Sequence, residues 1–230
     1  FNPKKTHFLI DTKHAGIMYP EAIKVAKKIT FNSIKASFGF TDSNNIGSIF
    51  YTAMQTVPIF LPNVLNKKNE SCLIPLGIDQ DVHFRLSRDV LEKLGHKKPA
   101  IIHSKFMVPL TGVEGKMSSS DPDKAILMTD TPKQVAKKIN KYAFSGGQDT
   151  IEEHRKKGGN IEVDVACQWL KYFEEDDKKL EEIYTKYSKG ELLSGEVKKI
   201  LIDKINTFLE NHQKQMQEKE KSVNEFIKKI

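Results

Sequence analysis

The segment from residue 115 to residue 122 has the composition of a phosphate-binding loop. It reads Gly-Lys-Met-Ser-Ser-Ser-Asp-Pro, so one lysine, Lys116, precedes three hydroxyl side chains. A lysine ammonium is a compact cation suited to a polyphosphate, and consecutive serines with their backbone N–H groups can surround an anion. The alternative is an exposed serine-rich linker between two domains, and the residue types alone leave both interpretations open.

Other motifs of known chemistry are absent from the sequence. It contains no GxxxxGK[ST] P-loop, no GxGxxG dinucleotide fingerprint, no HExxH zinc motif and no GxSxG nucleophile motif. The seven histidines and two cysteines show no metal-ligand spacing, so we expect no metal site built by the protein itself. The two cysteines, Cys72 and Cys167, exclude a disulfide-rich secreted fold and favour a reducing compartment such as the cytoplasm.

Composition indicates a globular protein for which a polyanion is one candidate partner. Of the 230 residues, 38% are hydrophobic and 29% charged, and the formal net charge is +7. No apolar run approaches the roughly 18 residues of a membrane-spanning helix, so we expect no membrane partner. The positive excess favours attraction to a nucleic acid or a polyphosphate. The alternative is that lysines mixed with glutamates only solvate helix surfaces.

Residues 1–130 alternate between strand and helix patterns. We expect strands at 6–10, 72–76 and 100–103, and helices at 20–30, 46–57 and 79–94. Gly95 is a typical signal for the end of the last of these helices. The alternation predicts an α/β fold with a parallel sheet, in which ligands bind beyond the carboxyl ends of the strands. Gln80 follows the strand at 72–76 and is therefore a candidate for that edge.

The chain reads as helical from residue 131 onward. Thr131, Pro132 and Gln134 have the residue types of an N-cap, a first helical position and a capping-box partner. A glycine-rich stretch at 145–160 surrounds a short helix at 150–157, and further helices are expected at 169–173, 180–187 and 196–230. We therefore place a domain boundary near residue 130 and expect an all-helical domain over residues 131–230.

Taken in order, these segments resemble the tryptophanyl-tRNA synthetases of the eukaryotic cytosolic type. The loop at 115–122 is similar to the KMSKS loop of class I aminoacyl-tRNA synthetases, and Ile78-Asp79-Gln80-Asp81 resembles the GxDQ-type segment of the tryptophan and tyrosine enzymes. Similar segments also occur at 30–32, 38–43, 72–75, 143–147, 149–155 and 158–160. The resemblance implies that residues 1–130 form the second half of a class I Rossmann-type nucleotide-binding fold. Residues 131–230 would form a helical tRNA anticodon-binding domain.

The resemblance implies roles in ATP chemistry for the loop. Lys116 would contact the β- and γ-phosphates and offset the charge that develops on the leaving pyrophosphate, while Ser118 and Ser120 would hydrogen-bond phosphate oxygens. Ser119 stands where most class I enzymes have a second lysine, as it does in the eukaryotic tryptophan enzymes. This departure leaves more of the charge to Lys116 and to the Mg²⁺ that accompanies ATP. The implied ATP-binding set is Lys116, Met117, Ser118, Ser119, Ser120 and Asp79, with Asp79 on the adenylate side.

Two glutamines are implied in tryptophan binding. By resemblance Gln80 contacts the polar end of the amino acid, and Gln55 on the apolar helix at 46–57 reaches its amine. The alternative for Gln55 is a core amide that bonds only to backbone. Asp149 matches the anticodon-side loop of the family, whereas Gln148 replaces a basic residue found there.

The resemblance implies an enzyme that activates tryptophan with ATP and Mg²⁺ and transfers it to tRNA(Trp), as a cytoplasmic homodimer. The HIGH-type motif of class I enzymes is absent, so we expect this chain to be the C-terminal portion and incomplete for catalysis alone. One alternative is a non-catalytic fragment that acts as a tRNA- or protein-binding module. Another is a structural protein in which the loop occurs by coincidence.

Overall fold

The computed structural model describes residues 2, 4–118 and 121–227, and it divides into two compact units. The first unit contains residues up to Lys105 together with those from Val223 on, and the second runs from Phe106 to Ser222. The division differs from the expected boundary near residue 130. The reason is packing: Leu110 is fully buried in the core of the second unit, and Met117 packs against it. The KMSKS-like loop is therefore part of the helical unit.

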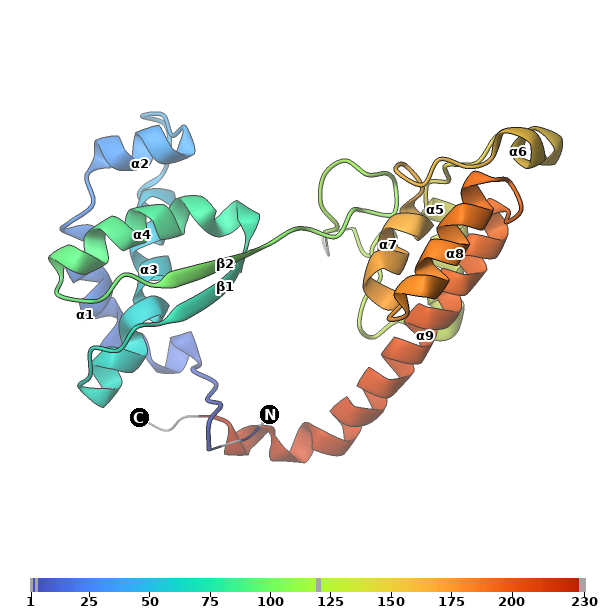
Figure 1. The fold of residues 1–230 in the computed structure, drawn as a ribbon. Helices are drawn as coiled ribbons and strands as arrows, with labels where there is room; N and C mark the ends of the chain where they lie inside the picture. The colour runs from blue at the N-terminus through green and yellow to red at the C-terminus, as the bar shows by residue number, and fades with distance from the viewer. Residues whose placement is uncertain (1, 3, 119–120, 228–230) are drawn as a thin grey trace. The chain divides into compact units, whose positions relative to one another are not determined.

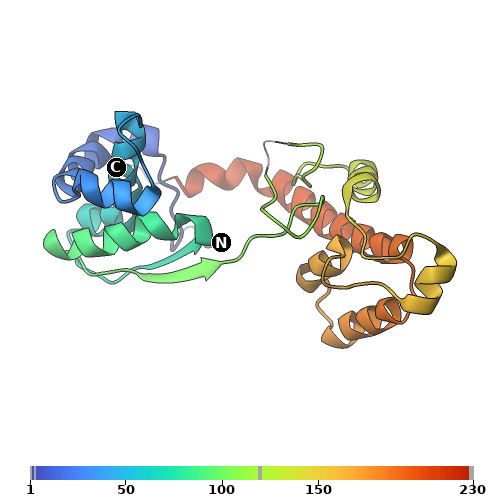
Figure 2. The ribbon, with the colours of Figure 1, turned by 90° about the horizontal axis from the view of Figure 1, so that it is seen from above.

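The first unit is an α/β structure around a two-stranded parallel sheet (Figure 1). The strands β1 (Leu73–Gly77) and β2 (Ala100–Ser104) pair in register from Leu73 opposite Ala100 to Gly77 opposite Ser104. Its other elements are η1 (Asp11–Lys13), α1 (Ala15–Ala26), α2 (Phe31–Phe38), α3 (Ile46–Asn66), η2 (Ile78–Gln80) and α4 (Asp81–Lys93). Helix α4 lies beside the strands in Figures 1 and 2. The α/β prediction for this part of the chain is confirmed.

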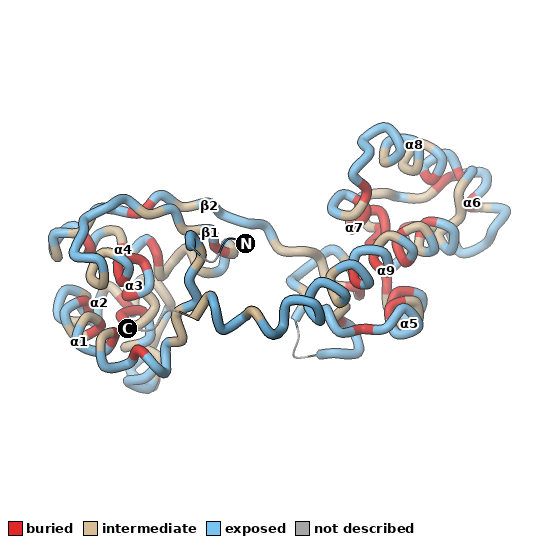
Figure 3. The backbone as a smooth tube through the Cα atoms, turned by 90° about the horizontal axis from the view of Figure 1, so that it is seen from below, coloured by how far each residue is buried: buried red, intermediate tan, exposed pale blue. Residues whose placement is uncertain are grey.

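Two helices of this unit differ in their bounds from the prediction, because buried apolar contacts offset the cost of proline. Helix α1, expected at 20–30, ends at Ala26 and therefore four residues earlier than predicted. Helix α1 begins five residues before Pro20, since Met18 is buried on the same face as Ala22 and Val25. Helix α3 continues through two prolines as far as Asn66, and Phe60 and its neighbours on that extension are buried. A proline inside a helix costs ~3 kcal/mol or more, so the apolar contacts beyond it must offset that cost. Figure 3 shows these buried stretches of α1, α3 and α4.

The N-terminal segment differs from the prediction of a strand at 6–10. Phe8 forms only an isolated bridge with Ile227 and does not join the sheet. Its N–H donates to the carbonyl of Phe226 over 2.8 Å, and the two phenyl rings stack with centroids 5.4 Å apart. This contact joins residues from opposite ends of the chain, so no local pattern could have predicted it.

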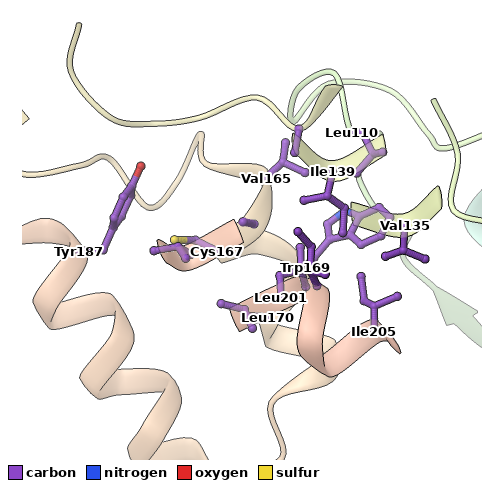
Figure 4. Packing of buried hydrophobic residues seen from close by; sticks show 14 of the residues in the cluster. Leu110, Val135, Ile139, Val165, Cys167, Trp169, Leu170, Tyr187, Leu201 and Ile205 are labelled. Atoms are coloured by element: carbon purple, nitrogen blue, oxygen red, sulfur yellow. The ribbon is translucent and has the colours of Figure 1, made fainter. Parts of the chain in front are cut away.

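Within the described residues, the second unit contains helices and no strand, and its helices begin at Pro132. Its elements are α5 (Pro132–Tyr142), α6 (Ile151–Lys157), α7 (Val165–Phe173), α8 (Asp177–Ser188) and α9 (Ser194–Lys219). The turn η3 (Glu220–Glu225) follows α9 and spans the division between the two units. The capping box of Thr131 and Gln134 is formed as predicted. Helix α9, the long red helix of Figure 2, ends at Lys219 rather than at the chain's end. Trp169 lies at the centre of the core in Figure 4, and its indole N–H donates to the Val108 carbonyl over 2.9 Å.

The glycine-rich stretch at 145–160 is packed tightly against the rest of this unit. The buried carboxylate of Asp164 accepts hydrogen bonds from the Gly146 N–H at 2.8 Å, the Cys167 N–H at 3.0 Å and the Tyr187 hydroxyl at 2.7 Å. Gly158 has a φ of +74°, and a Cβ there would collide with the Ser188 carbonyl. The glycines are thus required by close approach of the backbone. Within the described residues, no helix is long and apolar enough to cross a membrane.

Candidate active site

The carboxyl end of β1 presents Asp79 and Gln80, as predicted. Strand β1 ends at Gly77, and the single turn η2 carries both side chains before α4 begins (Figure 1). Asp79 is exposed and Gln80 is half-buried. Among the described residues, no hydrogen bond to the Gln80 side chain is formed, so its amide remains available to a ligand.

Gln55 lies on α3, which packs against α4. Its side chain is half-buried, and in the described part of the chain it makes no hydrogen bond. The alternative of a core amide that bonds to backbone is therefore not what the structure shows. A half-buried amide without a protein partner is expected to be paired by something else, such as a polar substrate group.

A polar seam that the sequence did not reveal joins α3 to α4 beside these glutamines. The Oγ1 of Thr52 lies 3.0 Å from Nδ1 of His83, and the Oγ1 of Thr56 lies 2.6 Å from Oγ of Ser87. Thr52, Thr56 and Ser87 are buried. In the sequence, this contact is indicated only by the helical spacing of Thr52 and Thr56 on one helix and of His83 and Ser87 on the other.

His83 in this seam is held as a neutral ring. Its imidazole packs against Phe38 at 4.5 Å and against Tyr51 at 5.5 Å between ring centroids. Burial lowers the pKa of His83, and the negative charge of Asp79 only partly opposes that effect. The imidazole is therefore neutral near pH 7 and acts as a hydrogen-bonding group rather than a cation.

Asp81 connects the start of α4 to His103 near the end of β2. Its carboxylate lies 2.6 Å from Nε2 of His103 and forms an ion pair with Arg85 one turn further along α4. The hydrogen bond from His103, aided by the charge of Arg85, lowers the pKa of the Asp81 carboxyl. The helix start that follows Gln80 is thus fixed by a charged contact as well as by its backbone.

The phosphate-loop candidates lie in the second unit. The ammonium of Lys116 is exposed and lies 5.2 Å from the centroid of the Phe106 ring. The N–H of Met117 donates to the Met107 carbonyl over 3.3 Å, and its half-buried side chain packs on the core. Ser118 is exposed. The predicted residues Ser119 and Ser120 lie outside the described residues.

The segment after the loop is clamped to α5 by a buried ion pair. The ammonium of Lys138 donates to the two carboxylate oxygens of Asp130 at 2.9 and 2.7 Å and to the Ala125 carbonyl at 2.9 Å. Asp130 also accepts from the Leu127 N–H at 2.8 Å. Sequence reasoning missed this clamp, because a lysine on an amphipathic helix is most often solvated.

The anticodon-side candidate Asp149 lies on the surface of the second unit. It is exposed and directly precedes Thr150, the N-cap of α6. The neighbouring Gln148 donates from its amide to the Gly158 carbonyl over 3.0 Å, which is a structural contact. The role of Asp149 stays a prediction. In the part of the chain that the structure describes, no group of three or more histidine, cysteine, aspartate or glutamate side chains could hold a metal ion.

Comparison with known proteins identifies relatives of both units. Residues 18–210 match the family of class I tRNA synthetases, W and Y. The chain is 55% identical over 227 residues to the tryptophan–tRNA ligase of Saccharolobus solfataricus, which covers 98% of this chain and 58% of the relative. It is 45% identical over 235 residues to the cytoplasmic tryptophan–tRNA ligase of Mus musculus, covering 99% of this chain and 49% of the relative.

A solved structure of the same kind of enzyme is similar to this chain in fold as well as in sequence. The crystal structure of Plasmodium falciparum tryptophanyl-tRNA synthetase is 46% identical and superimposes with a TM-score of 0.86, covering 98% of this chain and 61% of that one. The chain therefore spans about half to three-fifths of the length of the proteins it matches.

Proposed function

The chain belongs to the class I tRNA synthetases of the W and Y family, and we propose on this premise that it is part of a tryptophan–tRNA ligase. The observation that carries the proposal is the 55% identity with such a ligase over 227 residues, which are 98% of the chain. The matched length spans the lysine loop and the Asp79-Gln80 turn. In the proposed reaction a tryptophan carboxylate oxygen attacks the α-phosphorus of ATP. The bond from that phosphorus to pyrophosphate breaks, and the acyl group then passes to a ribose hydroxyl of tRNA with release of AMP.

Lys116 is proposed to act on the leaving group. An exposed ammonium at the start of a serine loop can approach the β- and γ-phosphates and stabilise the charge that develops on pyrophosphate. The backbone contact between Met117 and Met107 holds the beginning of the loop in place. ATP is proposed to enter with Mg²⁺ bound to its triphosphate, as part of the substrate.

Gln55 and Gln80 are proposed to bind the polar end of tryptophan. Both amides are half-buried, and within the described chain neither makes a protein hydrogen bond. An amide offers two donors and one acceptor, which suits a substrate with both an ammonium and a carboxylate. Asp79 is proposed to face the adenylate from the same turn.

The helical unit is proposed to bind tRNA(Trp) through its surface around Asp149. From the name of the Mus musculus ligase we propose the cytoplasm as the compartment. From the sequence resemblance to the family we also propose a homodimer. Because basic side chains that bind phosphates release the counterions condensed on tRNA, this binding should be sensitive to salt. A fragment that only binds tRNA or a protein is the competing outcome of the experiment below.

Replacement of Lys116 by alanine tests the proposed function. In a protein of the relatives' length that contains this chain, Lys116→Ala should slow tryptophan-dependent ATP–pyrophosphate exchange by about 10²-fold, since one transition-state charge contact is lost. Tryptophan affinity should hardly change, because the loop holds phosphates.

The matched control is Lys124→Ala, which removes a nearby exposed lysine that pairs with Asp121 over 2.9 Å. This variant should keep exchange within twofold of the parent. Exchange within twofold for Lys116→Ala would refute the role of the loop. A parent protein that binds tRNA but shows no exchange would favour the non-catalytic module.

A further inference from the structure

We propose that Thr52 and His83 are positioning residues for the amino-acid site, because their hydrogen bond sets the spacing of the two glutamines. Thr52 holds α3, which carries Gln55, to His83 on α4, which begins directly after Gln80. The inference rests on the proposed role of these glutamines in tryptophan binding. Thr52 and His83 would support the tryptophan site without contacting the substrate themselves.

The placement of the four residues along their helices carries the inference. Thr52 precedes Gln55 by three residues, and His83 follows Gln80 by three residues. Residues three apart on a helix lie next to each other on the same face. Gln80 has αR backbone angles of −85° and −10°, so the helical path of α4 already includes it. The 3.0 Å bond between Thr52 and His83 therefore joins the two helices one turn from each glutamine.

The residues around the hydrogen bond between Thr52 and His83 restrict the movement of both side chains. Thr52 is almost completely buried, so its hydroxyl cannot exchange its partner for water. The half-buried imidazole of His83 packs against the rings of Phe38 and Tyr51, which restrict its rotation. Loss of the hydroxyl would leave the ring nitrogen without this partner and would allow α3 and α4 to shift where Gln55 and Gln80 lie. Misplacement by about 1 Å can reduce the rate of an enzyme up to ~10²-fold.

The second bond of the seam supplies a matched control. Thr56 and Ser87 join the same two helices over 2.6 Å, and both are as deeply buried as Thr52. Ser87 lies about two turns along α4 from Gln80, and its hydroxyl also donates to the His83 carbonyl. Ser87→Ala therefore weakens the packing of α3 on α4 about one turn farther from Gln80 than the bond of Thr52 to His83.

The experiment compares Thr52→Val with Ser87→Ala in a protein of the relatives' length that contains this chain. Pyrophosphate exchange gives KM for tryptophan and for ATP, and thermal unfolding gives Tm. We expect Thr52→Val to raise KM for tryptophan about five- to tenfold and to change KM for ATP less than twofold. Ser87→Ala should lower Tm to a similar extent yet leave KM for tryptophan within twofold. Thr52→Ser, which keeps the hydroxyl, should restore the parent's KM.

Two results would overturn the inference. One is an unchanged KM for tryptophan in Thr52→Val, and the other is an equal rise in Ser87→Ala, which would indicate general destabilisation. The bond itself is checked without catalysis, because the Nδ1 chemical shift of His83 in NMR spectra should change in Thr52→Val and not in Ser87→Ala. An unchanged shift also overturns the inference. A parent protein without tryptophan-dependent exchange would instead refute the proposed function, and the two failures are thereby distinguished.

Discussion

At the scale of single residues, the site depends on polar side chains that the folded protein leaves open. The Gln80 amide is half-buried at the carboxyl end of β1, and the described chain offers it no hydrogen-bond partner. By contrast, the amide of Gln168 donates to the Ile161 carbonyl over 2.8 Å, and that of Gln148 donates to the Gly158 carbonyl. This contrast with two structurally paired amides supports the proposal that Gln80 binds a ligand.

Gln80→Ala should therefore weaken tryptophan binding by about 1–3 kcal/mol, because a polar group of the substrate loses its partner. Calorimetric titration of a protein of the relatives' length would measure this loss. Binding of ATP in the absence of tryptophan should change less. Gln134→Ala is the control, since it removes the capping-box amide of α5 and should leave tryptophan affinity unchanged. Equal losses for both ligands in Gln80→Ala would show that the residue is structural.

At the scale of elements, the ion pair between Asp130 and Lys138 fixes the segment that follows the candidate phosphate loop. The Lys138 side chain is 11% exposed and that of Asp130 only 4% exposed. The three donors of the ammonium match its three acceptors: two carboxylate oxygens and the Ala125 carbonyl. Gln213 of α9 adds a hydrogen bond to the Asp130 carbonyl over 3.1 Å. The chain is thus attached to two helices directly after the loop.

Lys138→Met should destabilise the helical unit by roughly 3–5 kcal/mol, because the Asp130 carboxylate would remain buried without its cation. Denaturant unfolding followed by circular dichroism would measure the effect. Lys137→Met is the control, since this neighbouring lysine is exposed and should change stability by less than about 0.5 kcal/mol. A loss below about 1 kcal/mol in Lys138→Met would mean that water replaces the pair.

At the scale of the whole molecule, the sheet of the first unit is small and partly uncovered. It has two strands within the described residues, and Leu73 and Ile102 on them are 58% and 51% exposed. Exposed apolar side chains on a sheet favour association with other protein surfaces. The chain also spans only 58% of the Saccharolobus solfataricus ligase.

We therefore expect the 230 residues alone to show no tryptophan-dependent pyrophosphate exchange and to self-associate. Exchange would be assayed on a chain whose length is verified by mass, and association by sedimentation velocity. Replacing Leu73 and Ile102 together by threonine should reduce association without restoring activity. Clear turnover by the 230-residue chain would contradict this expectation.

The sequence by itself determined those features whose causes are local. The capping box of α5, the end of α4 at Gly95 and the position of Gln80 after a strand all follow from residues within a few positions of one another. The lysine–serine loop was also evident from residue types, although its membership of the helical unit was not.

Only the tertiary structure decided the features that depend on distant contacts. Helix α3 continues beyond Pro58 because Ile59, Phe60 and Leu61 are buried, and Val64 and Leu65 beyond Pro62 pack against the same core. Phe8 forms a bridge with Ile227 and does not join the expected strand. The same holds for the bond from Thr52 to His83, which joins residues 31 positions apart. Hydrophobic burial and buried hydrogen bonds depend on which surfaces meet in three dimensions, and local propensities of a fraction of a kcal/mol per residue are too weak to oppose them.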